Sequence, residues 1–254
     1  MLIPRVLPCL LIDSTQHLVK TISFESRTYI GDPLNAAYLF SSFEADEILV
    51  LDIDASTEVR SISLPFVKEL ARFASVPLTI GGGITSLQTI EDIISLGVER
   101  VALSSALASQ PALLNDATSR FGSSSIVVII NVVAYSEGIY FAKFGKDPST
   151  PLISLDDAIN YCQINGAGEI VLHDVNRDGS RLGFNNSLFS QYARNCDIPI
   201  IALGGGSTQR DVCKLLKSSN IAAAALGSTF VYAPNTNQVL INYFNYSSTL
   251  SKSS

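Results

Sequence analysis

The chain of 254 residues is poor in metal-ligating side chains: it contains two histidines, no tryptophan and one methionine. The four cysteines are Cys9, Cys162, Cys196 and Cys213. They show no CxxC spacing and stand near neither histidine in sequence, which argues against a zinc site and against the disulfide framework of small secreted domains. We therefore predict reduced cysteines, no metal and no cofactor.

Positive charge and long apolar runs are also scarce. The chain has 17 Lys and Arg against 23 Asp and Glu, a formal net charge of −6. An acidic surface attracts neither nucleic acid nor an anionic membrane, so both are excluded as main partners, and any anion site must be local. No secretory or membrane-spanning segment is visible. The sequence predicts a soluble, cytoplasmic protein with one domain over residues 1–244 and a loose tail over 245–254.

Short β-branched runs recur along the chain with helical patterns between them. The predicted strands are Arg5–Ile12, Glu47–Ile53, Leu78–Ile80, Arg100–Ser104, Ser125–Val132, Glu169–Asp174, Ile198–Leu203 and Ala222–Leu226. The predicted helices include Leu64–Phe73, Leu87–Leu96, Ser154–Asn165 and Ser207–Lys217. Regular alternation of strand and helix favours an α/β fold of the (β/α)8 TIM-barrel type over an open Rossmann sheet, which carries one GxGxxG turn.

The two halves of the chain resemble each other. A strand that ends in Gly81-Gly82-Gly83 has its counterpart in one that ends in Gly204-Gly205-Gly206. Residues 50–54 align with 171–175, and residues 97–105 align with 220–228. This internal similarity predicts a twofold half-barrel repeat.

Each half places glycines and small hydroxyl residues directly after buried strands, where backbone N–H groups can bind a phosphate. The predicted first cradle is Gly82, Gly83, Ser104 and Ser105, and the second is Gly205, Gly206, Gly227 and Ser228. Lys20 is a candidate to add positive charge. A single GGG is more often a tight turn, but two at matching repeat positions predict a ligand with two phosphates.

Several motifs are similar to those of the cyclase subunit of imidazole glycerol phosphate synthase, the HisF family. They are residues 5–10 (RVLPCL), 31–33 (GDP), 51–56 (LDIDAS), 78–84 (LTIGGGI), 121–123 (FGS), 166–170 (GAGEI) and 177–179 (RDG). The resemblance covers essentially the whole chain. It implies a barrel whose C-terminal face binds a bisphosphate ribonucleotide and whose core conducts ammonia from a glutaminase docked on the opposite face.

The same resemblance identifies departures at the catalytic positions. The family uses two aspartates for proton transfer, and at these positions the chain has Leu11 and Asn131, neither of which is a proton-transfer base. A further polar position of the family is Leu203 here. The usual Arg-Asp-x-Gly-Asp of the first loop is replaced by residues 28–32 (TYIGD). Two family roles are therefore vacant.

Other family positions are kept. The charged ring that the family uses as an ammonia gate at the barrel floor corresponds to Arg5, Glu47, Arg100 and Glu169, and the acidic position offered to the glutaminase corresponds to Glu99. Two acids and two bases neutralise each other, so such a ring can persist when buried, and it can also be a mere plug. Inward-facing Cys9, Val127, Ile129 and Ala225 are predicted wall residues of the bore.

These features favour an ammonia-conducting subunit that pairs with a HisH-type glutaminase and binds a phosphorylated small molecule. Residues 8–11 (PCLL), 20–21 (KT) and 29–33 (YIGDP) resemble those of the HisF-like proteins of surface-polysaccharide pathways, which hand ammonia to a separate sugar amidotransferase. The first alternative is an active cyclase of histidine biosynthesis that uses Asp13, His173 or Asp178 as substitute acid and base. If Arg5 points inward, strand alternation would place Asp13 one layer above Leu11. His173 also fits a plain hydrogen-bonded role, and Asp13 a solvated loop. The second alternative is a scaffold that stimulates the glutaminase without conducting ammonia.

Overall fold

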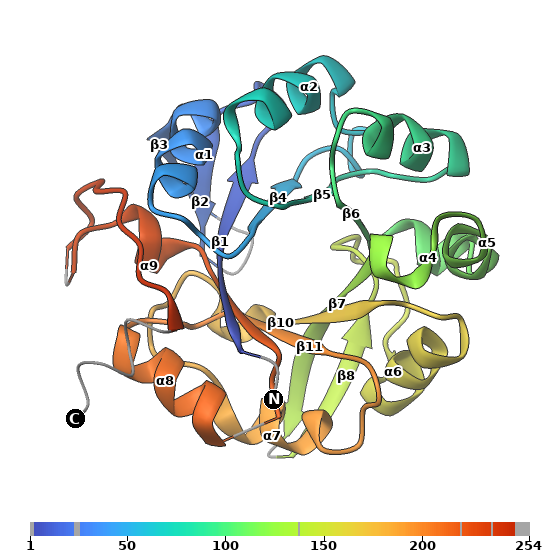
Figure 1. Cartoon of the computed structure of the whole chain (residues 1–254). Helices are drawn as coiled ribbons and strands as arrows, with labels where there is room; N and C mark the ends of the chain where they lie inside the picture. The colour runs from blue at the N-terminus through green and yellow to red at the C-terminus, as the bar shows by residue number, and fades with distance from the viewer. Residues whose placement is uncertain (1–2, 23–25, 137, 219, 235, 247–254) are drawn as a thin grey trace.

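The computed structural model describes residues 3–22, 26–136, 138–218, 220–234 and 236–246. Its strands form a closed ring viewed end-on in Figure 1. The barrel strands are β1 (Arg5–Ile12), β4 (Ile48–Asp52), β5 (Leu78–Gly81), β6 (Arg100–Leu103), β7 (Ile126–Ser136), β10 (Glu169–Asp174), β11 (Ile200–Leu203) and β12 (Ala223–Leu226). Each pairs in parallel with both neighbours, and the β7–β10 pairing closes the ring. The predicted (β/α)8 barrel is confirmed.

Helices cover the outside of this ring. They are α1 (Pro33–Ser42), α2 (Leu64–Phe73), α3 (Leu87–Ser95), α4 (Ala106–Ser109), α5 (Ala112–Phe121), α6 (Leu155–Ile164), α7 (Asn186–Ala193), α8 (Gln209–Ser218) and α9 (Ser228–Val231). Side-chain caps start several of them: Ser63 accepts the N–H of Phe66 before α2, and Ser154 accepts that of Asp157 before α6. The predicted helix from 64 to 73 matches α2 at both ends.

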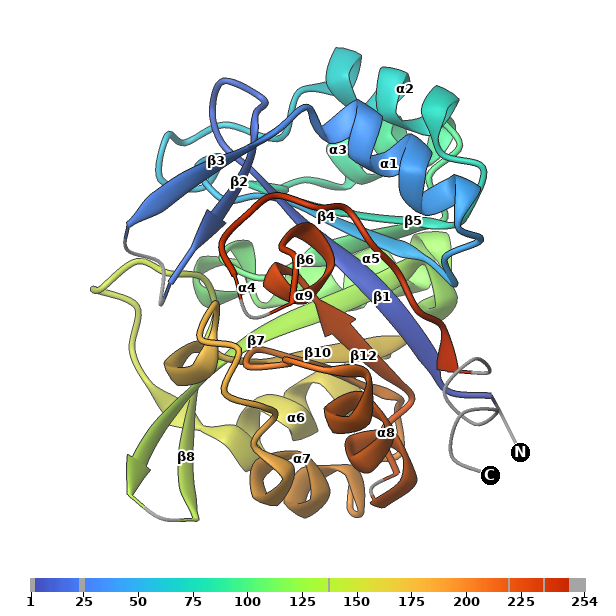
Figure 2. The same cartoon turned by 90° about the vertical axis from the view of Figure 1, so that its left-hand side faces the viewer.

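Two antiparallel excursions were not predicted. β2 (Leu18–Thr21) and β3 (Arg27–Gly31) form a hairpin after β1, and β7 runs on to pair with β8 (Ile139–Lys143), which pairs with β9 (Ile153–Ser154). Both leave from the same end of the barrel, at the left of Figure 2. The predicted fifth barrel strand ends at Val132, whereas β7 continues to Ser136. The two excursions form part of the wall around the opening at the C-terminal ends of the barrel strands, which we call the mouth.

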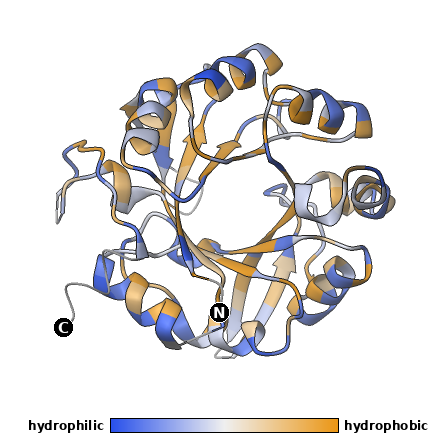
Figure 3. Cartoon of the chain, viewed as in Figure 1, coloured by the Kyte–Doolittle hydropathy of each residue, from blue (hydrophilic) through white to orange (hydrophobic). Residues whose placement is uncertain are grey.

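The barrel has two separate apolar layers. Side chains on the outer strand faces pack against the helices, and Figure 3 shows the strand ring as predominantly hydrophobic. Alternate residues point inward and form a second cluster, because side chains of a strand alternate between its faces. That inner cluster consists of Leu7, Cys9, Leu49, Ala102, Val127, Ile129, Val171, Ile201, Leu203, Ala223 and Ala225, with Leu11 and Leu51 packed on it. All four predicted wall residues belong to it.

The proposed single domain over residues 1–244 stays a prediction. Of the expected loose tail, Asn245 and Tyr246 are described and residues 247–254 lie outside the described residues. Within the described ranges, no helix has the length and apolarity needed to cross a bilayer.

Candidate functional site at the barrel mouth

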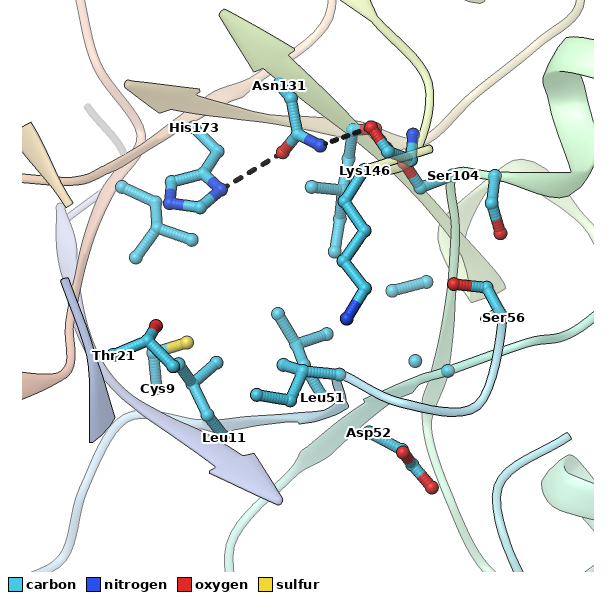
Figure 4. Close-up of a pocket in the computed structure, with 18 of the residues that line it drawn as sticks. Cys9, Leu11, Thr21, Leu51, Asp52, Ser56, Ser104, Asn131, Lys146 and His173 are labelled. Atoms are coloured by element: carbon cyan, nitrogen blue, oxygen red, sulfur yellow. Dashed lines mark hydrogen bonds between the residues drawn. The ribbon is translucent and has the colours of Figure 1, made fainter. Parts of the chain in front are cut away.

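A cavity opens at the C-terminal ends of the barrel strands, and Figure 4 shows the side chains around it. Its empty volume, open mouth included, is about 990 Å³. The apolar part of its lining comes from Cys9, Leu11, Leu51, Ala102, Ile129 and Leu203. The polar part includes Lys20, Thr21, Ser56, Asn131, Lys146, His173 and Asp178. The inner core therefore leads directly into a pocket of mixed character.

Leu11 and Asn131, at the two positions where the resemblance implies aspartates, both face this cavity. Asn131 Nδ2 donates to the carbonyl of Gly145 at 2.8 Å, and its Oδ1 lies 3.1 Å from His173 Nδ1. An amide held at both ends positions its neighbours but does not exchange protons near neutral pH. Neither position can supply the family's acid or base.

His173 and Asp178, both predicted as substitute catalytic residues, meet at the cavity wall. His173 Nε2 lies 3.4 Å from Asp178 Oδ1. Burial by itself raises the pKa of Asp178, but the hydrogen bond from His173 and the charges of His173 and Lys20 bring that pKa below its usual range. The surroundings of Asp178 therefore favour its carboxylate form, and this carboxylate lies next to the imidazole of His173.

Asp13 is not brought to the cavity, which corrects the expectation that it lies one layer above Leu11. β1 ends at Ile12, and the chain then turns instead of continuing the strand alternation. The Asp13 Oδ1 atom accepts from Thr15 N at 2.9 Å, Thr15 Oγ1 at 2.7 Å and His17 N at 3.0 Å. Its carboxylate thus stabilises its own turn.

The first predicted phosphate cradle borders the cavity. Gly83 has φ +61°, and a Cβ there would lie 1.8 Å from the carbonyl oxygen of Arg60, so only glycine fits. Gly82 and Ser105 line the same pocket. Ser104 serves a different purpose: its hydroxyl donates to Ile129 O at 2.8 Å and accepts from Gly145 N at 2.9 Å. Ser104 therefore joins β6 to β7 and is not oriented to donate to a phosphate.

The second predicted cradle is a smaller hollow that shares part of its lining with the main cavity. The glycines Gly205, Gly206 and Gly227, with Ser228, line it. Gly227 and Ser228 line the main cavity as well. The two glycine-rich loops therefore border connected hollows, and their binding of phosphate stays a prediction.

Lys20 does not point freely into that space. It is buried, and its Nζ donates to the carbonyl of Cys9 at 2.8 Å. A Cβ on Gly227 would lie 2.4 Å from this Nζ, so the lysine fills the room that the glycine leaves. Burial lowers the pKa of Lys20, while the nearby Asp178 opposes the change. Lys20 lies beside the second cradle but already has a protein partner.

The four predicted gate residues form a closed ring of alternating charge at the other end of the barrel. Arg5 contacts Glu47 at 2.5 Å and Glu169 at 2.5 Å, and Arg100 contacts them at 2.7 Å and 3.1 Å. Thr79, which the sequence did not single out, donates to the second carboxylate oxygen of Glu47 at 2.5 Å. Burial raises the pKa of Glu169, and the two arginines oppose this change. The ring neutralises itself.

Glu99, predicted to contact a glutaminase, already has a partner within the chain. Its Oε2 accepts the backbone N–H of Leu78 at 2.7 Å. The carboxylate therefore caps the start of β5, and its predicted docking role stays a prediction.

One further group at the mouth was missed from the sequence. Asp54, buried after β4, accepts two hydrogen bonds from Arg27 of β3 at 2.5 and 2.6 Å and one from Ser14 N at 3.0 Å. Lys146 Nζ lies 3.8 Å from it and reaches across the cavity (Figure 4). The sequence offered two signals: an acidic residue two places after Asp52, which ends β4, and the adjacent pair Gly145 and Lys146. Neither signal indicated that Asp54 pairs with Arg27. We call Arg27 and Asp54 the mouth tether.

Comparison with known proteins agrees with this geometry. The sequence profile described as "Histidine biosynthesis protein" matches residues 5–236. The chain is 36% identical to the putative imidazole glycerol phosphate synthase subunit HisF of Leptospira interrogans, covering 96% of each chain. It is 37% identical to the putative subunit hisF3 of Vibrio vulnificus (96% and 94% covered) and 37% to the subunit HisF of an Exiguobacterium species (89% and 88%). The chain belongs to the histidine-biosynthesis barrel family and is a homologue of HisF-type imidazole glycerol phosphate synthase subunits.

Proposed function

We propose that the chain is the barrel subunit of a glutamine-dependent complex that conducts ammonia without carrying out the cyclase reaction. A glutaminase of the HisH type would dock at the floor and release ammonia at the charged ring. The ammonia would cross the inner apolar cluster and leave at the mouth. Relatives named as imidazole glycerol phosphate synthase subunits support such a pairing.

The observation that carries this proposal is the contrast between the two ends of the barrel. The ring of Arg5, Glu47, Arg100 and Glu169 is complete and paired on every side. At the mouth, by contrast, Leu11 and an amide-locked Asn131 occupy the positions of the family's acid and base. Neutral ammonia loses little on entering an apolar core, whereas ammonium loses much, so the inner cluster suits the neutral molecule.

Both phosphate cradles fit this proposal as recognition or regulatory sites. They open onto the same cavity, so a phosphorylated ligand bound there would close or reshape the exit. The final acceptor would be a separate enzyme, and the motifs shared with polysaccharide-pathway proteins favour a sugar amidotransferase. A gene for such an enzyme beside this one would support that choice, and a histidine operon would contradict it.

The deciding experiment supplies the purified chain with the ribulose-form bisphosphate substrate of the family and ammonium at alkaline pH. We expect no imidazole product above the level of a Leu11→Ala variant. Robust product formation by the chain alone would refute the conduit proposal and favour an active cyclase.

The alternative of an active cyclase has one observation in its favour, the His173–Asp178 pair at 3.4 Å beside the cavity. His173→Gln and Asp178→Asn should then each abolish turnover. A pure scaffold is tested by Cys9→Trp, which fills the inner cluster. Conduction predicts that glutamine hydrolysis continues while ammonia transfer to the acceptor is lost, whereas a scaffold keeps both coupled.

A further inference from the structure

Thr21 contributes a buried hydroxyl to the lining of the cavity. The residue is 3% exposed, and its Oγ1 has no hydrogen-bond partner within the described part of the chain. β2 pairs antiparallel with the end of β1, Leu11 opposite Val19, so the chain returns toward Cys9 at Thr21 (Figure 4). Leaving a buried hydroxyl unsatisfied costs about 1–3 kcal/mol, so this group points to a bound guest.

The neighbours of Thr21 form a polar corner of the cavity. Gly179 packs on its backbone, because a Cβ there would lie 2.2 Å from Thr21 O, and this brings the loop of Asp178 alongside. The lysine of the corner, Lys20, is committed to Cys9 O at 2.8 Å. Apolar wall residues, among them Leu11, Leu51 and Leu203, lie between this corner and the polar groups elsewhere on the wall, such as Asn131 and Lys146.

We propose that Thr21 and Asp178 form a station that holds ammonia as it leaves the barrel core. This inference rests on the proposed conduit function. The guest must be small, because Thr21 stands beside Cys9 at the top of the inner cluster. A guest that donates hydrogen bonds suits this corner, because the carboxylate of Asp178 lines the same cavity as Thr21. Ammonia meets both demands: the hydroxyl can donate to its lone pair while its N–H groups face Asp178.

The station explains why the polar corner lies directly above the apolar cluster. Within that cluster a migrating ammonia molecule has no side-chain hydrogen-bond partner. The Thr21 hydroxyl is the first such partner that it reaches, so ammonia is held there at the exit. A hydroxyl both donates and accepts, and it therefore binds the neutral molecule without requiring a proton transfer. The site must bind weakly, since a conduit has to release what it holds.

The test uses ammonium chloride at alkaline pH, where part of it is present as neutral ammonia, as the probe and the isolated chain as the receptor. With two histidines in the sequence, the imidazole NMR signals of His173 and His17 are readily distinguished. We expect His173 to shift saturably with ammonium and not with equal tetramethylammonium or sodium chloride. Thr21→Val keeps the shape but loses the hydroxyl and should weaken binding about two- to tenfold, the value of one hydrogen bond.

Matched variants separate this role from packing. Thr21→Ser keeps the hydroxyl and should bind within about twofold of the natural chain, and Thr28→Val on the exposed face of β3 should change nothing. Equal binding by Thr21→Val, or no saturable shift with ammonium, overturns the station. Because the glutaminase is absent from this assay, a failure of ammonia transfer in the complex would refute the conduit separately.

Discussion

The mouth tether offers the sharpest test of how the hairpin of β2 and β3 is held at the cavity. Asp54→Asn removes the negative charge at nearly constant shape, and Arg27→Met removes the guanidinium. Removing one member of a fully buried ion pair costs about 3–5 kcal/mol. Here the Asp54 side chain is 7% exposed but that of Arg27 is 43% exposed, so solvent screens the pair. We expect a coupling of about 1–2 kcal/mol between the two substitutions.

Asp54→Asn alone should cost more than Arg27→Met alone, because the carboxylate also accepts from Ser14 and faces Lys146. The hydrogen bonds from Arg27 lower the pKa of Asp54 below its ordinary value. The stabilisation is therefore present above the unfolded-state pKa of about 3.9 and is lost as the pH falls through the lower folded-state pKa. The effect of Asp54→Asn should shrink in the same acidic window.

Urea unfolding of both single variants and the double variant gives the coupling energy, and hydrogen exchange reports whether β2 and β3 open first. The expected result is non-additive unfolding free energies and faster exchange confined to the hairpin. If the two effects add within about 0.3–0.5 kcal/mol, the tether does not act as a pair and the reasoning fails.

Three further outcomes follow from single contacts. Glu47→Gln removes one of the two negative charges that pair with Arg5 and Arg100. Urea unfolding should show an unfolding free energy lower by about 2–4 kcal/mol. An unchanged value would mean that the ring is solvated. Burial raises the pKa of the Cys9 thiol to about 11, so at pH 8 iodoacetamide should label Cys196 well before Cys9, as mass spectrometry of the peptides would show. Gly83→Ala places a Cβ against the carbonyl oxygen of Arg60 and should lower the unfolding free energy by more than about 1 kcal/mol. It should also weaken the binding of inorganic phosphate, measured by calorimetry. An unchanged phosphate affinity would show that this loop is not part of the first cradle.

Much of the site could be read from the sequence, because strand alternation fixes which residues face the core. If Arg5 faces the barrel interior, alternation along β1 places Cys9 and Leu11 on the same inner face. Both residues line the cavity in the structure. The count failed at Asp13, where the strand had already ended. It also could not show that the Ser104 hydroxyl is occupied, since its partner Gly145 comes from a distant loop.

The sequence by itself determined the barrel, the repeat within the sequence and the charges of the ring, because these depend on local alternation and on residue type. It also has Leu11 and Asn131 at the two positions where the resemblance implies aspartates. Only the tertiary structure decided which polar groups remain available at the mouth. Asn131 contacts His173, Lys20 contacts Cys9, and Arg27 contacts Asp54, at sequence separations of 11 to 42 residues. Hydrogen-bond partners are chosen by spatial proximity after the chain has closed, and a pattern along the sequence carries no record of that choice.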